Sequence, residues 1–406
     1  MQERNLSMMT RKVLNKRVLS QAFLALAFDL GGILSGRIAL VFSPLFGSAP
    51  WILALFPPML SVRGDIGGIF AGKLGTMLHL GEVEPRLRRN TPEFYSLIKS
   101  MFFLTFVDTI GIGIIAFIIN FFLGNTTSQH LLLFILVPPV SCLLAMTLVI
   151  PIGTILGINI FKRGLDPDII VYPAMSTLDD VVITICYVFA VNLAFIPSAL
   201  FGMLIIIIVL GFFFSVMFMK CREDRAFRRT LKEGAPMVLL SSFIGTLGGV
   251  GLASIREEIE KKPSILMLYP ALIDTLGDIG SILGAMVTTK LALDRISSFW
   301  GSLKEGFADL VSVEIAAAVM HVLFGVTAFL LGKATGLTPD LLLLVNIALI
   351  SNLMSFLFIS LLSFIVATQT FKHRLDPDNF VIPLVTSIAD FGATFALIAA
   401  LLILKV

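Results

Sequence analysis

The chain consists almost entirely of apolar runs that are long enough to cross a lipid bilayer. We expect spans at residues 19–46, 49–78, 95–123, 131–160, 167–194, 198–219, 236–257, 264–290, 307–332, 338–371 and 378–404. A helix needs about 20 apolar residues to cross roughly 30 Å of hydrocarbon, whereas spanning strands would be shorter and would alternate in polarity. With 57% hydrophobic and 14% charged residues, the 406-residue chain has too little polar surface for a water-soluble globule. The sequence therefore predicts an all-α integral membrane protein with about 11 transmembrane helices.

Charge and cysteine content exclude several other classes. The net charge is only +3, and the basic residues are spread over short loops, so we expect no nucleic-acid partner. Cys142, Cys186 and Cys221 are far apart and lack metal-ligand spacing, which argues against a zinc site or a disulfide framework. The first 18 residues are basic and lead directly into a full span, so we expect them to be retained as a cytoplasmic tail rather than cleaved.

The distribution of basic residues predicts the orientation of the chain. Loops 43–48, 124–130 and 192–198 contain no Lys or Arg, whereas the connections on the other side carry most of the basic residues. Because cytoplasmic loops are enriched in Lys and Arg, the N-terminus is expected in the cytoplasm and the C-terminus outside the cell membrane. The loop at 256–262 breaks this pattern with mixed charge.

Two copies of one motif divide the chain into halves. The matching residues are Asp166, Pro173 and Asp180 in the first copy and Asp376, Pro383 and Asp390 in the second, 210 positions later (376 minus 166). A second match supports the duplication, since residues 64–67 and 277–280 both read GDIG, 213 positions apart (277 minus 64). We therefore predict four regions: a basic tail at 1–18, a five-helix repeat at 19–196, a connector at 197–234 and a second repeat at 235–406.

The odd number of helices in each repeat predicts how the halves are related. A five-helix unit would invert its partner, and the extra helix in the connector restores the parallel orientation. Two parallel repeats imply a pseudo-twofold axis along the membrane normal, with equivalent residues facing each other across it.

Polar residues of the two fifth spans fall on one helix face. The stripes are Pro173, Thr177, Asp180 and Thr184 in the first copy, and Pro383, Ser387, Asp390 and Thr394 in the second. Their spacing of i, i+4, i+7 and i+11 puts each set on one side of a helix. A carboxylate within a bilayer costs about 2.5–3.5 kcal/mol and is by default a functional candidate. Cation binding or proton carriage would compensate for this cost.

The oxygen-only character of these side chains favours a hard cation. Without a Cys or His cluster, copper and zinc are disfavoured, and magnesium, which keeps several waters, can be held by a few spaced carboxylates. The same chemistry does not separate magnesium from manganese, calcium or protons. We expect Mg²⁺ as the transported ion, no organic cofactor, and the following metal-binding residues: Asp180, Asp390, Asp65, Asp278, Thr177, Ser387, Asp108, Glu314 and Asp29.

Purely structural roles are the alternative for each of these residues. Hydrogen bonds between packed helices would account for a buried aspartate, and Arg63 could neutralise Asp65 as an ion pair. Asp179 could simply flank the true ligand, and Asp274 has Ser61 at its matched position, so the duplication does not support it. Asp29 similarly matches Thr246.

The duplicated unit resembles the MgtE and solute carrier family 41 magnesium transporters. The resemblance rests on the Pro-rich and Gly-Asp segments of the second helix, the Asp-Pro start of the fifth helix and the acid within it. In that family the fifth-helix acid lines a central magnesium site, which the resemblance assigns here to Asp180 and Asp390. Asp65 and Asp278 match positions that the family often fills with Asn. The tandem arrangement is closer to the solute carrier 41 branch, which implies that one chain forms a complete path through the membrane, with lipid as its surroundings.

Two other functions are weighed against magnesium transport. The first is a proton- or sodium-coupled carrier of another cation. The second is an intramembrane aspartyl protease, suggested by Leu276-Gly277-Asp278, although such an enzyme needs one acid dyad rather than repeat-related pairs. We expect no enzymatic activity. The sequence leaves open whether the path is a channel or a carrier.

Overall fold

All the described secondary structure is helical. The computed structural model describes residues 14–46, 49–163, 167–292, 299–373 and 377–406. Within these ranges no strand occurs, and the side chains of Arg63, Asp65 and residues 167–174 and 377–383 lie outside the description. The helices are α2 (Lys16–Leu26), α3 (Leu30–Ala39), η1 (Leu40–Leu45), α4 (Trp51–Leu80), α5 (Pro92–Phe122), η2 (Ser128–His130), α6 (Leu131–Lys162), α7 (Pro167–Ala194), α8 (Pro197–Cys221), α9 (Arg225–Ser254), α10 (Arg256–Lys261), α11 (Ser264–Ala292), α12 (Phe299–Ala334), α13 (Leu341–Lys372) and α14 (Pro377–Leu404).

Eleven of the described helical segments are long and apolar enough to span a membrane, which confirms the predicted number. The protein is therefore a multi-pass membrane protein. The first span is interrupted where the sequence predicts one continuous helix, because α2 ends at Leu26 and α3 begins at Leu30. The mixed-charge loop after α9 forms a short helix, α10. Helices α7 and α14 begin at Pro167 and Pro377, where proline fits the first turn, while Asp166 and Asp376 lie outside the described residues.

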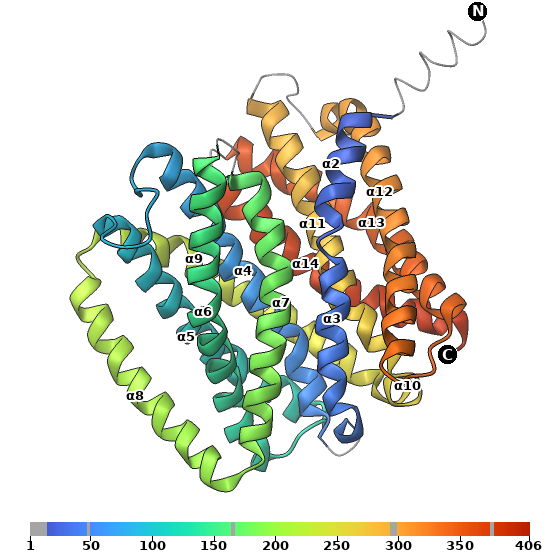
Figure 1. Ribbon diagram of the computed structural model, residues 1–406, viewed down its shortest axis with the longest axis horizontal. Coiled ribbons are helices and arrows are strands. Elements are labelled where there is room, and N and C mark those ends of the chain that lie inside the picture. Colours follow the sequence, from blue (N-terminus) through green and yellow to red (C-terminus); the bar gives the residue numbers. More distant parts are fainter. Residues whose placement is uncertain (1–13, 47–48, 164–166, 293–298, 374–376) are drawn as a thin grey trace, which may run out of the picture.

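The first helix of each half packs against the second helix of the other half. Helix α3 lies on α11, and α9 lies on α4. Figure 1 shows the blue α2 and α3 beside the orange α12, which belongs to the C-terminal half of the sequence. Glycines allow the close approach: a methyl group on Gly32 would lie 2.6 Å from the backbone nitrogen of Ala271, and one on Gly249 would collide with the carbonyl of Ala54. Small residues commonly allow membrane helices to approach each other this closely.

The start of each first helix is also fastened to the third helix of the other half. Asn15 caps α2, its backbone N–H donates to Ser312 on α12 (2.8 Å), and its side-chain amide donates to Asp309 (2.7 Å). Asp224 caps α9 and accepts a hydrogen bond from Ser96 on α5 (2.7 Å). The two halves are therefore interlocked by their first helices rather than packed as separate bundles.

The remaining packing follows the same scheme in both halves. Helix α7 packs against α4 and α6, and α14 packs in the same way against α11 and α13. Helix α8 is different, because it stands at the edge of the molecule in Figure 1 and only three of its side chains, Met203, Ile207 and Phe214, are buried. This arrangement fits its expected role as a connector outside the repeated units.

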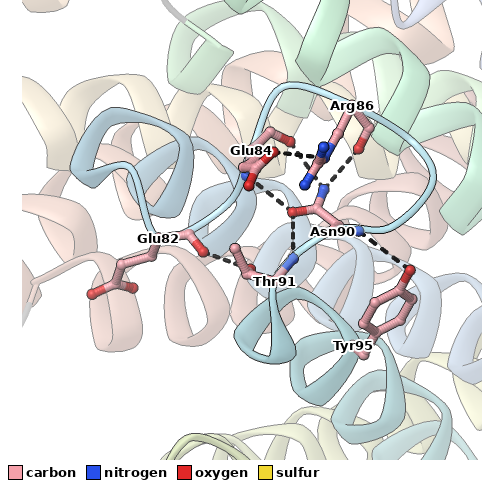
Figure 2. A network of polar contacts seen from close by, with 6 residues as sticks. All are labelled: Glu82, Glu84, Arg86, Asn90, Thr91 and Tyr95. Atoms are coloured by element: carbon pink, nitrogen blue, oxygen red, sulfur yellow. Dashed lines mark hydrogen bonds and ion pairs between the residues drawn. The ribbon is translucent and has the colours of Figure 1, made fainter.

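The connection between α4 and α5 is held by the side chain of Asn90. Its carbonyl oxygen accepts from the backbone N–H groups of Glu84 (3.0 Å) and Thr91 (2.8 Å), and its amide donates to the carbonyls of Glu84 (2.9 Å) and Arg86 (2.7 Å). Figure 2 shows these contacts together with the bond from Thr91 Oγ1 to the carbonyl of Glu82 (2.6 Å). One polar side chain thus satisfies four backbone groups of the loop.

Candidate cation site

The acid of the first fifth helix is fully buried beside the first helix of the same half. Asp180 on α7 is 0% exposed. Ser35 on α3 donates to the backbone carbonyl of Asp180 (3.1 Å), and its hydroxyl lies 2.6 Å from that of Thr184, one turn further along α7. Gly31 on α3 leaves room for Thr177, whose hydroxyl donates to the carbonyl of Phe28 (2.7 Å). The oxygen-bearing stripe of α7 therefore faces α3 rather than lipid.

The acid of the second fifth helix contacts the opposite half directly. Asp390 on α14 is partly buried, and its Oδ2 accepts a hydrogen bond from Ser61 on α4 (2.5 Å). Ser387, one turn earlier, donates to Ser241 on α9 (2.5 Å). Thr394, one turn later, lies 2.8 Å from the hydroxyl of Tyr269 on α11. This stripe also points into the protein, between helices of both halves.

Further acids lie on the elements around these two stripes. Asp29, fully buried at the break between α2 and α3, accepts a hydrogen bond from Thr275 on α11 (2.7 Å). Asp274 and Asp278 on α11 are buried, with 6% and 4% exposure. Asp179 lies against α4, because a methyl group on Gly67 would be 2.6 Å from its Oδ2. The side chain of Asp65 lies outside the described residues, and so do those of Pro173 and Pro383.

Two predicted acids lie on the third helices, each bound to a different neighbour. Asp108 on α5 accepts a hydrogen bond from Ser242 on α9 (2.6 Å). Glu314 on α12 accepts one from Asn352 on α13 (3.0 Å). Neither residue has a hydrogen bond to the fifth helices among the described residues, so their place in a common path stays a prediction.

The sequence did not predict the hydroxyl groups on neighbouring helices that bind the predicted site residues. Ser35, Ser61, Ser241 and Thr275 each bind a member of the predicted set or its helix. Their signal in the sequence is weak, because serine and threonine are common in membrane helices and usually bond to their own backbone. Ser61 had a specific signal, since it occupies the position that matches Asp274.

No group of three His, Cys, Asp or Glu side chains in the described part of the chain forms a compact metal cluster. The arrangement instead distributes single carboxylates, hydroxyls and carbonyls along several helices. Such a set suits an ion that keeps part of its water shell, as magnesium does, and does not suit a tetrahedral structural metal.

Comparison with known proteins connects this arrangement to a family. The profile of the family described as "MgtE: Divalent cation transporter" matches residues 56–190 and again residues 269–400. Solute carrier family 41 member 3 of Rattus norvegicus is 21% identical over 373 residues, which cover 86% of this chain and 79% of the relative. Solute carrier family 41 member 2 of Xenopus laevis is 22% identical over 386 residues, with 86% and 65% covered. No solved structure matches the chain.

Proposed function

This chain belongs to the MgtE family of divalent cation transporters, and on that premise we propose that it carries magnesium through the membrane between its two halves. The proposed path is lined by Asp180 and Asp390 of the fifth helices and by Asp65 and Asp278 of the second helices. The hydroxyls of Thr177 and Ser387 extend it, and Asp29 lies at the break in the first span. The N-terminus is proposed to lie in the cytoplasm, following the positive-inside rule.

The observation that carries this proposal is the hydrogen bond between Ser61 and Asp390. It joins the second helix of one half to the acid of the fifth helix of the other. An acid at this junction can contribute to a path shared by both halves, which an acid confined within one bundle could not do.

A pseudo-twofold axis is part of the proposal. It is supported by the two matches of the family profile and by the recurrence of equivalent helix pairs, α3 with α11 and α9 with α4. The axis would bring α4, α7, α11 and α14 around one centre, and a divalent ion there would offset the repulsion between neighbouring carboxylates.

We leave Asp108 and Glu314 out of the proposed ligand set. Their hydrogen-bond partners, Ser242 on α9 and Asn352 on α13, lie on helices that flank the proposed centre rather than on α4, α7, α11 or α14. The family is one of transporters, so no enzymatic activity is proposed, and the protease hypothesis gains no support.

Flux measurements on the purified full chain in liposomes test the proposal. With a magnesium indicator trapped inside, external magnesium is expected to enter faster than in protein-free liposomes. Excess manganese or calcium outside the liposomes would reveal selectivity by slowing this entry. Absence of magnesium entry, combined with rapid entry of another cation, would contradict the assignment of magnesium.

A further inference from the structure

A second buried polar region lies between α12 and α13, apart from the proposed path. Glu314 and His321 are two turns apart on α12, and His321 is 0% exposed. Helix α13, which packs against α12, carries Ser351, Asn352, Ser355 and Ser360, all of which are at most 4% exposed. A region this polar inside a helical hairpin of a membrane protein is a candidate functional site.

Several polar atoms of this region have no hydrogen-bond partner among the described residues. They are Glu314 Oε2, His321 Nε2, Asn352 Oδ1 and the hydroxyls of Ser351, Ser355 and Ser360. Many buried hydroxyls elsewhere in the chain bond to the carbonyl four residues earlier, as Ser141 and Thr109 do. Buried polar groups without partners are costly and uncommon, so their concentration in one hairpin needs an explanation.

Three contacts fix the register of the two helices. Glu314 bonds to Asn352, a methyl group on Gly325 would lie 2.7 Å from the Cα of Val345, and one on Gly306 would lie 3.2 Å from the ring of Phe364. In this antiparallel register, Ser351 lies at a level between Glu314 and His321. Ser355 and Ser360 continue from Glu314 toward Asp309, which pairs with Lys290 (2.6 Å). The polar groups thus form a line of successive levels along the hairpin, although Ser351 and Ser360, nine residues apart, lie on opposite sides of α13.

The corresponding hairpin of the first half lacks this line. Gly113 and Gly325 make the same close approach to the next helix, which aligns α5 with α12 at an offset of 212 (325 minus 113). At that offset Glu314 matches Phe102 and His321 matches Thr109. Helices α6 and α13 align at 210, because Phe161-Lys162 matches Phe371-Lys372 (371 minus 161), so Asn352, Ser355 and Ser360 match Cys142, Ala145 and Ile150. The feature therefore belongs to the second half alone.

The chemistry of this line fits a proton better than a metal ion. His321 Nδ1 lies 2.8 Å from the carbonyl of Ala317 and must donate to it, which leaves Nε2 as a bare acceptor. Glu314 is the other group of the line that can gain or lose a proton, and chains of Glu and His residues serve as proton relays in transporters. The region offers one carboxylate and no compact cluster of three metal-binding side chains among the described residues.

We propose that the α12–α13 hairpin is a proton relay in which Glu314 and His321 exchange protons while the cation crosses between the halves. A proton leaves the Glu314 carboxyl and binds His321 Nε2, giving a carboxylate and an imidazolium with no change in total charge. Seven residues along a helix span about 10.5 Å, so the proton passes through intermediate polar groups rather than directly. The coupling, but not the relay itself, rests on the proposed cation transport.

Other titratable groups near the relay come from the helices packed against α12 and α13. Helix α13 itself has no acidic or basic residue before Lys372. The titratable groups on the other elements are Lys16 and Arg17 on α2, Asp29 and Arg37 at α3, Tyr269, Asp274, Asp278 and Lys290 on α11, and Asp378 and Asp390 on α14. Helix α12 also carries Lys304, Glu305, Asp309 and Lys333.

The test follows protons and magnesium together in liposomes that contain the full chain and a trapped pH indicator. Magnesium entry is expected to change the internal pH in the wild type. In Glu314→Gln and His321→Asn, the internal pH change that accompanies magnesium entry should fall to that seen in protein-free liposomes. Ser141→Ala, at the matched position of Ser351 in the first half, should leave the ratio unchanged. Size-exclusion profiles establish that each variant is folded.

The outcomes separate this proposal from the transport proposal. Magnesium entry without a proton signal, or a signal that both variants retain, would overturn the relay. A signal that depends on external sodium instead of pH would also overturn it and would assign the region to sodium. If the wild type moves no magnesium, an imposed membrane potential drives protons alone: proton entry lost in Glu314→Gln supports the relay, and its absence in the wild type overturns it.

Discussion

The two halves of the protein share their helix packing but differ in the polar contacts around equivalent acids. Asp180 is completely buried, and Ser35 of the same half bonds to its backbone. Asp390 is partly exposed, and Ser61 of the other half bonds to its carboxylate. Packing depends on small residues that both copies retain, whereas each polar contact depends on a single side chain. The two halves thus share one helix packing while the two acids have different surroundings.

The largest effect is expected where the first helix of each half packs against the second helix of the other half. Glycines on α3 and α9 allow this close packing in both halves. Gly249→Leu and Gly32→Leu each place a side chain against backbone of the other half, at Ala54 and Ala271. We expect a loss of more than about 3 kcal/mol, because backbone cannot move aside as a flexible side chain can. Thermal unfolding in detergent would show a large drop or no folded protein.

The matched control is Gly202→Leu on α8, where no atom lies within 4 Å of the added carbon. It should unfold close to the wild-type temperature. If Gly202→Leu and Gly249→Leu lowered the unfolding temperature equally, the packing of α9 on α4 would not depend on the close approach of the two helices.

The halves also differ in the hydrogen bond made at the position of Asp29, and two variants can measure this difference. Thr275→Val removes the hydroxyl that donates to the Asp29 carboxylate, and a buried hydrogen bond to a charged group contributes about 2 kcal/mol. Among the described residues, the hydroxyl of Thr246, which matches Asp29 in the second half, bonds only to the carbonyl of Ser242, so Thr246→Val should cost about 0.5 kcal/mol. Chemical unfolding of both variants would measure this contrast, and equal losses would argue against a special role of the Asp29 contact.

The two serines beside the fifth helices are expected to affect magnesium binding unequally. Ser61→Ala removes a donor to the Asp390 carboxylate and should change the apparent magnesium affinity about fivefold, corresponding to about 1 kcal/mol. Ser35→Ala removes a bond to a backbone carbonyl and should change it less. Magnesium-dependent thermal stabilisation measures both affinities. A larger effect at Ser35 would reverse our assignment.

The smallest effect is expected where the first helices begin. Burial would raise the pKa of Asp224, but the hydrogen bonds from Ser96 and from the backbone N–H groups of Phe227 and Ala226, with the nearby Lys99, lower it overall. A lowered pKa stabilises the fold above the unfolded value of about 3.9, and this contribution is lost as the pH falls through the folded value.

Asp224→Ala should therefore destabilise the protein by about 1 kcal/mol at neutral pH through loss of the helix cap. The difference from the wild type should shrink in acid. Asn15, which caps the other first helix, does not titrate, so the effect of Asn15→Ala should not shrink through loss of charge at the cap itself. Unfolding curves at several pH values would measure both, and a difference for Asp224→Ala that grows in acid would contradict the sign.

The sequence predicts where the helices of this protein lie along the chain better than which helices pack against each other. All eleven spans and the starts at Pro167 and Pro377 follow from apolar length and proline chemistry, which are local properties. The sequence could not predict that α3 packs on α11 and α9 on α4 of the opposite half. The same glycines would allow each helix to pack equally closely against a helix of its own half. The break at Asp29 was missed for a related reason, since its contact with Thr275 is 246 residues away.

The acids were identifiable because charge inside an apolar run is conspicuous. Their hydroxyl partners were not, because Ser35 and Ser61 differ little from serines that bond to their own helix. The polar region on α12 and α13 was also hidden, since Asn352 can be recognised as the partner of Glu314 only once the two helices lie side by side.

The central claim is that the fifth-helix acids of both halves serve one cation path. Its most direct test is magnesium entry into liposomes with the double variant Asp180→Asn and Asp390→Asn, which keeps side-chain size and removes both charges. Asp340→Asn, at the cap of α13, is the matched control because Asp340 bonds only to the start of its own helix among the described residues. Our account predicts that the double variant admits no more magnesium than protein-free liposomes while the control behaves as the wild type. Undiminished magnesium entry in the folded double variant would contradict it.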